Sequence, residues 1–173
     1  MNDSWAGPVS PMVRSAIFVA DLARSAAFYR EILQLDEVFF EGELSDGNAH
    51  LLLGMPAGMT TRALILKAPG PAWGMVGLFE LTDPAPRPIA HRDENAANVG
   101  ETCLVFYCAD LDPVLAALNA GGHTVLCPPT RLVIGDFVKQ REMTFRDPDG
   151  IMINLIEWDP SADVRPETRR PAD

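Results

Sequence analysis

Histidine and cysteine supply most nucleophiles, general bases and soft metal ligands, and this chain has three of each. The histidines stand at positions 50, 91 and 123, without the i, i+2 or i, i+4 partners of metal-ligand pairs. The cysteines form neither a C-x-x-C pair nor an even disulfide framework, at positions 103, 108 and 127. We therefore interpret the histidines as surface residues and the cysteines as free thiols of a reducing cytoplasm.

Composition limits the partners of the protein. The chain has 173 residues and a net charge of −10, and 47% of its residues are hydrophobic. This negative charge repels phosphate backbones and anionic lipids, which excludes nucleic acid and membrane as main partners. No apolar run reaches the roughly 18 residues of a membrane span, and residues 1–11 lack the basic and apolar regions of a signal peptide. We expect a cytoplasmic protein whose partner is a small molecule.

A pattern that occurs twice indicates which elements position the functional side chains. Val19-Ala20-Asp21-Leu22 recurs as Cys108-Ala109-Asp110-Leu111, and each copy follows an apolar strand-like run, 12–19 and 101–108. Each copy also opens a helix-like stretch. We expect Asp21 to cap a helix through about residue 33. We expect Asp112 to cap the second helix, with Pro113 at its first position and Gly121-Gly122 at its end.

The remaining strands complete two similar halves. Alternating or apolar runs predict strands at 37–43, 62–67 and 77–81, and then at 124–127, 138–146 and 151–158. Each half therefore has the order β-α-β-β-β. The predicted fold is α+β: two βαβββ modules forming curved mixed sheets around a shared cleft. The predicted boundaries are an N-terminal arm 1–11, a single domain 12–158 and a disordered tail 159–173. Within the domain we expect module one at 12–82, a linker at 83–100 and module two at 101–158.

Two motifs at this separation resemble the vicinal oxygen chelate superfamily of glyoxalase I, bleomycin-resistance proteins and extradiol dioxygenases. The run from Phe18 through Val19-Ala20-Asp21-Leu22 and Ser25 to Phe28-Tyr29 resembles its opening, and 145–150 (FRDPDG) its closing hairpin. Glu80-Leu81-Thr82 resembles the strand that ends the first module of glyoxalase I. The resemblance covers 12–158. It implies a glyoxalase-like fold and a homodimer.

The resemblance also implies a site where four side chains hold one divalent metal. The corresponding positions here are Arg14, Glu80, Cys103 and Asn154. Only Glu80 is an ordinary hard-metal ligand, because arginine is always protonated and presents donors alone. Glu157, close to Asn154, falls on the opposite face of its strand. We therefore predict no metal.

In place of the metal we expect Arg14 to supply the positive charge. Glu80 would be its ion-pair partner or a general base, and Asn154 a second donor to a ligand oxygen. The alternative is that Arg14 and Glu80 form a buried pair that closes a dead site. Residues that alternate onto the same strand faces as these four would line an apolar cavity, the alternative being that they fill a core: Phe18, Leu78, Cys103, Val105, Tyr107, Met152 and Ile156.

The insertion 45–58 is expected to fold over this cavity. It would bring His50 and an apolar lid of Leu51, Leu52, Met55 and Met59. The alternative is that these residues pack outside the sheet or in a dimer contact.

Three functions remain open at this stage. The first is a metal-independent lyase or isomerase-type enzyme, without a cofactor, acting on a small oxygenated, partly apolar metabolite. The second is a non-catalytic protein that sequesters a hydrophobic compound, as resistance members of the superfamily do. The third is a metal-dependent glyoxalase or dioxygenase with non-standard ligands such as His50 and Glu80. We favour the first, because several polar groups are expected to converge in the cleft.

Overall fold

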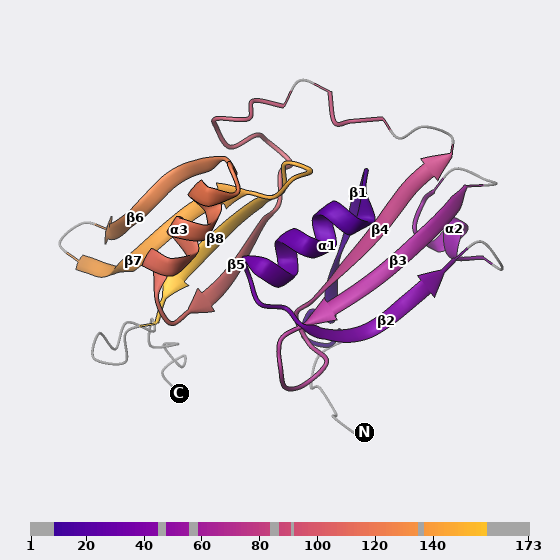
Figure 1. Cartoon of the computed structure of the whole chain (residues 1–173), viewed down its shortest axis with the longest axis horizontal. Helices are drawn as coiled ribbons and strands as arrows, with labels where there is room; N and C mark the ends of the chain where they lie inside the picture. The colour runs from indigo at the N-terminus through magenta and orange to yellow at the C-terminus, as the bar shows by residue number, and fades with distance from the viewer. Residues whose placement is uncertain are drawn as a thin grey trace, which may run out of the picture. The chain divides into compact units, whose positions relative to one another are not determined.

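A computed structural model describes residues 9–44, 48–55, 59–83, 87–90, 92–134 and 137–158. The chain divides into two compact units, Met1–Ala90 and His91–Asp173. Each unit contains a four-stranded mixed sheet and one ten-residue helix (Figure 1). This confirms the predicted α+β fold with two βαβββ modules. Most of the predicted arm and all of the predicted tail lie outside the described residues.

The N-terminal unit has the strand order β1-β4-β3-β2. β1 runs parallel to β4, and the other neighbours are antiparallel. Helix α1 lies across one face of this sheet (Figure 1). Its elements are β1 Arg14–Val19, α1 Leu22–Glu31, β2 Glu37–Glu43, α2 Ala49–Leu52, β3 Thr60–Lys67 and β4 Met75–Asp83.

Helix α1 forms the core of this unit with the sheet face that it covers. Asp21 caps the helix as predicted, since its carboxylate accepts the backbone N–H of Arg24 at 3.0 Å. Alternation along β1 buries Ile17 and Val19 and leaves Arg14 and Phe18 exposed. The residues of β1 that face away from α1 are therefore not part of this core.

The C-terminal unit repeats the same architecture, with the order β5-β8-β7-β6. Its elements are β5 Cys103–Cys108, α3 Leu111–Ala120, β6 Val125–Ile134, β7 Phe137–Arg146 and β8 Met152–Glu157. β5 pairs parallel with β8, as β1 does with β4. In the described part of the chain, every helix is too short or too polar to cross a membrane.

Helix α3 begins two residues earlier than we predicted. Asp110, and not Asp112, has the extended backbone of an N-cap, and its carboxylate accepts the N–H of Asp112 at 2.9 Å. Leu111 is the first helical residue, as Leu22 is in α1, so Pro113 stands in the first turn behind it. Gly122 ends the helix with a φ of 67°.

Replacing Asp110 by alanine is expected to lower the free energy of unfolding by about 1 kcal/mol, because the first turn loses its cap. The measurement is urea denaturation followed by tryptophan fluorescence. Asp112→Ala is the matched control, because Asp112 carries the same charge in the first turn and pairs with Arg141 at the surface but is not the N-cap. A larger loss in Asp112→Ala than in Asp110→Ala would contradict this cap assignment.

Strand β6 is longer than predicted, and the reason is its position at the sheet edge. We expected it to end at Cys127, because Pro128 and Pro129 follow. It continues to Ile134, and its pairing with β7 shifts register between Cys127 and Thr130. An edge strand tolerates proline at such an irregularity, because the missing N–H is not needed by a second neighbour.

Candidate functional site

An apolar pocket of about 340 Å³ lies in the N-terminal unit, on the sheet face opposite α1. Of the lining residues that the structure describes, one is charged, three are aromatic and the others are aliphatic: Arg14, Phe39, Phe40, Leu44, Ala49, Leu52, Leu53, Ile65 and Phe79. Small-molecule sites commonly have about 300–1,000 Å³ and an apolar wall with few polar groups. The pocket therefore has the size and lining of a site for a compact apolar ligand.

The strand register explains why residues distant in sequence meet on this face. Phe40 of β2 stands opposite Ile65 of β3, and Phe79 of β4 stands beside Phe18 of β1. Side chains of directly paired residues project to the same side of a sheet. The ring of Phe18 lies 6.0 Å from that of Phe79. The lining phenylalanines Phe39, Phe40 and Phe79, which we call the aromatic wall, thus come together because β2, β3 and β4 pair in this register.

Helix α2 borders the pocket beside the end of β2 (Figure 1). Of the four residues expected in an apolar lid, Leu51 and Leu52 are both exposed, and Leu52 lines the edge of the pocket. Met55 and Met59 are buried and anchor the segment, and the Thr61 hydroxyl contacts the Met55 sulfur at 3.3 Å. The side chain of His50 lies outside the described residues.

Glu80 lies on the other face of the sheet, so the predicted Arg14–Glu80 pair is wrong. β1 and β4 pair Arg14 with Met75 and Val19 with Glu80. Positions 14 and 19 are an odd number of residues apart, so they project to opposite faces. Glu80 is buried and accepts the Leu22 backbone N–H at 2.9 Å and the Arg62 Nε–H at 2.7 Å.

The prediction that Leu78 lines the cavity is wrong for the same reason. It pairs with Ile17 on the α1 side and is fully buried there. It therefore belongs to the core and not to the lining of a cavity on the opposite face.

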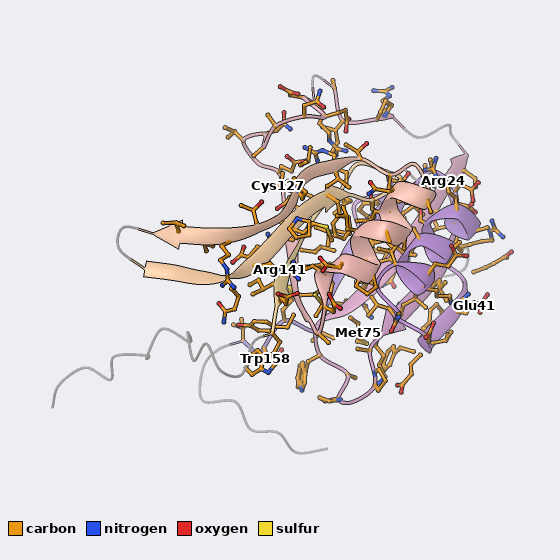
Figure 2. All side chains as sticks on the ribbon, turned by 60° about the vertical axis from the view of Figure 1, so that its left-hand side comes forward. Arg24, Glu41, Met75, Cys127, Arg141 and Trp158 are labelled. Carbon is orange, nitrogen blue, oxygen red and sulfur yellow. The ribbon has the colours of Figure 1, made fainter. Side chains whose placement is uncertain are left out.

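The C-terminal unit contains the same arrangement at equivalent positions. Glu157 of β8 accepts the Leu111 N–H at 3.3 Å and two N–H groups of Arg141 at 2.8 and 2.6 Å (Arg141 is labelled in Figure 2). Hydrogen bonding to Arg141 lowers the pKa of Glu157, and Glu157 in turn raises the pKa of Arg141. We call Glu80 with Arg62 and Leu22, and Glu157 with Arg141 and Leu111, the two helix–sheet clamps.

The six C-terminal residues predicted at the site share one face, opposite α3. The parallel register pairs Cys103 with Met152, Val105 with Asn154 and Tyr107 with Ile156. Val105 and Tyr107 are well exposed, whereas the alternate residues Leu104, Ile153 and Leu155 are buried. The Tyr107 ring meets the Trp158 ring edge-on at 5.2 Å.

The polar side chains of Cys103 and Asn154 on this face are poorly suited to act as a nucleophile or a general base. Cys103 is exposed, but partial desolvation raises the pKa of its thiol, which keeps it neutral and a poor nucleophile at pH 7. The Asn154 side-chain amide donates a hydrogen bond to the Thr144 hydroxyl at 3.1 Å. The geometry of this face therefore supports contact with a ligand better than it supports catalysis.

Arg146, from the closing-hairpin motif, is buried and fixes the segment 92–101 against its own unit. Its guanidinium donates to the backbone carbonyls of Glu94, Ala96 and Gly150 at 2.8, 2.7 and 2.7 Å, and to the Glu101 carboxylate. Hydrogen bonding to Arg146 lowers the pKa of Glu101 to about 2. The later part of the predicted linker 83–100 is therefore held by hydrogen bonds to Arg146, although most of its residues are exposed.

A second, polar pocket of about 450 Å³ borders this Arg146 network. Arg146 and Asp147 line it, together with His123 and Asp149. Arg146 donates to Gly150 and Glu101, and the Asp147 carboxylate accepts the N–H groups of Asp149 and Ile151 at 2.9 and 2.7 Å. The polar groups of this pocket thus maintain the hairpin itself.

With these faces defined, the chain can be compared with known proteins. Residues 12–155 match the family described as the Glyoxalase/Bleomycin resistance protein/Dioxygenase superfamily. The chain belongs to this superfamily. None of the curated proteins compared with the chain matches it.

Solved structures share the superfamily fold at low sequence identity. A glyoxalase family protein from Bacillus cereus has a TM-score of 0.68 at 17% identity, covering 88% of this chain and 96% of that one. TnmS3, an antibiotic-binding protein from Streptomyces, has a TM-score of 0.55 at 19% identity, covering 88% and 99%. The trypanothione-dependent glyoxalase I of Leishmania major has a TM-score of 0.56 at 18% identity, covering 86% and 87%. These similarities establish the fold alone.

The divalent metal implied by the resemblance to this superfamily does not fit the residues of this member. Arg14 offers donors only. Glu80, the one conventional ligand among the four positions, faces α1 and is held by Arg62. Among the described residues, no three or more His, Cys, Asp and Glu side chains are grouped so that they could hold a metal ion.

Reasoning from the sequence missed the aromatic wall of Phe39, Phe40 and Phe79 and both clamp arginines. A comparison of the two halves could have found the face of Glu80, whereas the face of Phe39 and Phe40 had no such signal. Glu157 had already been placed on the face opposite Asn154, and the equivalent position in the first half is Glu80. The pair Phe39-Phe40 lies in a correctly predicted strand, 37–43, but the register shift between Val38 and Phe40 hides its face.

Proposed function

We propose that this superfamily member binds a small apolar, aromatic molecule in the pocket of its N-terminal unit, without converting it. The observation that carries the proposal is the lining of that pocket, in which three phenylalanines and five aliphatic residues surround about 340 Å³. Burying apolar surface there contributes about 25 cal/mol per Å² to binding. That TnmS3 is described as antibiotic-binding supports such a use of the fold.

Binding is favoured over a lyase or isomerase activity because the proposed base is occupied. Glu80 was the expected general base, and both of its carboxylate oxygens accept hydrogen bonds on the α1 side of the sheet. Of the other two proposed groups, Asn154 is an amide, and Arg14 is a permanent cation that cannot accept a proton. The part of the pocket wall that the structure describes therefore supplies apolar surface and one charge but no acid–base pair.

Binding can be tested with 2-naphthamide, a neutral fused-ring probe, by isothermal titration calorimetry. Phe40→Ala is expected to weaken its binding about tenfold, because the pocket loses part of its aromatic wall. Val38→Ala is the matched control, since Val38 is an exposed residue of the same strand that pairs with Leu66 on the α1 side. Equal affinities for the probe in Phe40→Ala and the unmodified protein would contradict the proposed site.

Absence of turnover is tested on the natural ligand. A ligand extracted from freshly purified protein and identified by mass spectrometry is expected to remain chemically unchanged after prolonged incubation with fresh protein. Appearance of a product that the protein forms catalytically would restore the enzyme hypothesis.

A further inference from the structure

We infer that Arg14 makes this pocket selective for aromatic ligands that carry a carboxylate. The inference rests on the proposed function and adds the chemical class of the ligand. It predicts a preference for a monoanion over a neutral or cationic molecule of the same shape.

The first observation is the position of the Arg14 guanidinium. Among the nine described residues that line the pocket, Arg14 alone is charged. It is exposed at the start of β1, and within the described part of the chain its side chain has no hydrogen bond or ion pair. Its donors are therefore available to a ligand.

The second observation is that nearby charged side chains are paired with one another or lie on the α1 side of the sheet. Lys67 is neutralised by Glu37 at 2.5 Å, and Arg62 by Glu80 at 2.7 Å. The β2 carboxylates Glu41 and Glu43 pair across the ladder with Leu64 and Arg62, which project to the α1 side together with Leu78 and Glu80 (Glu41 is labelled in Figure 2). These carboxylates do not compete with a ligand for Arg14.

Arg14 therefore gives the pocket a local preference for anions, although the net charge of the chain is negative. A chain with a net charge of −10 repels anions at long range. At close range a guanidinium offers two parallel N–H groups that match a carboxylate, and the apolar walls strengthen that attraction by lowering the local dielectric. A neutral ligand would instead displace water from the cation without compensation. A flat ring against the phenylalanines with a carboxylate at Arg14 satisfies both parts of the pocket.

The test compares three probes of one shape: 2-naphthoate, 2-naphthamide and 2-naphthylmethylammonium. Calorimetry of the full chain at low salt is expected to show that 2-naphthoate binds about tenfold more tightly than 2-naphthamide. The cation is expected to bind more weakly than either. The advantage of 2-naphthoate should shrink as salt rises, because the Arg14 end of the pocket is exposed and screened.

Two variants and a control assign the preference to Arg14. Arg14→Met is expected to bind both 2-naphthoate and 2-naphthamide with similar affinity, and Arg14→Lys to keep part of the difference, because lysine retains the charge without the bidentate fork. Arg24→Met removes the same charge from exposed Arg24 on α1, on the other side of the sheet, and should leave the preference intact (Figure 2).

The outcomes separate the two proposals. Equal binding of 2-naphthoate and 2-naphthamide by the unmodified protein, or a preference that survives in Arg14→Met, would overturn the role of Arg14 while leaving the apolar pocket in place. Failure of all three probes to bind would overturn the proposed function and, with it, this inference.

Discussion

Replacing Arg146 by methionine is expected to lower the free energy of unfolding by about 3–5 kcal/mol, the range for breaking a buried ion pair from one side. The side chain of Arg146 is 2% exposed and that of Glu101 is 9% exposed, so the remaining carboxylate would stay buried without its cation. The carbonyls of Glu94, Ala96 and Gly150 would lose their donor at the same time. Urea denaturation followed by tryptophan fluorescence measures the loss.

An exposed arginine of the same unit provides the control. Arg131→Met on β6 removes an equal charge from the surface and is expected to cost less than about 1 kcal/mol. In a double-mutant cycle, Arg146→Met combined with Glu101→Leu should lose less stability than the two single variants together. If Arg146→Met were as stable as Arg131→Met, the segment 92–101 would not depend on this contact.

The same contact has a signature in the pH dependence of stability. Glu101 has a pKa of about 2 in the folded protein, against an ordinary value of 4.5, because Arg146 donates to it. A depressed folded-state pKa contributes stability above the unfolded value, and this contribution is lost as the pH falls from about 4.5 towards 2. Glu101→Gln is expected to remove this part of the acid dependence. An unchanged acid profile in that variant would show that Glu101 titrates normally.

Glu80→Ala is expected to lower the free energy of unfolding by about 1–3 kcal/mol, because the Leu22 N–H loses a buried acceptor. Arg62 is 55% exposed at its side chain and can turn to water, which keeps the cost below that of Arg146→Met. The affinity for 2-naphthamide should remain unchanged, since Glu80 faces away from the pocket.

Two further variants sharpen this second prediction. Glu157→Ala should cost a similar amount, because Glu157 holds Leu111 and Arg141 in the same way. Glu41→Ala, an exposed carboxylate of β2, should cost little. Glu80→Ala with normal stability and abolished probe binding would return Glu80 to the binding site.

The fold could be predicted from the sequence because the local signals agree with one another. The repeated Asp21 and Asp110 motifs mark two strand–helix junctions, and strand alternation places the remaining elements. The failures lie where local pattern and tertiary position conflict. Pro128 and Pro129 are typical of a strand end, but an edge strand accommodates them.

The candidate site was predicted less well, for physical reasons. Arg14 and Phe18 were placed on the correct face, because alternation within one strand is a local property. Glu80 was placed on the wrong face, because its side depends on the register between β1 and β4. Arg146 lies 45 residues from Glu101 and 52 from Glu94 in the sequence, so no local pattern predicts that they meet.

The two clamps also bear on how readily such a protein can acquire new ligands. Within this one chain, the halves agree on the helix side, with Glu80 and Glu157, Arg62 and Arg141 at matching places. On the other side they differ: Arg14 corresponds to Cys103, and Gly77 to Asn154. The clamp residues of the N-terminal unit therefore lie on the opposite face of its sheet from Arg14, whereas the pocket residues Ile65 and Phe79 are buried. Substitution of the exposed pocket residues Arg14, Phe39 and Leu52 is therefore expected to change ligand preference with little loss of stability, which makes these positions favourable targets for engineering.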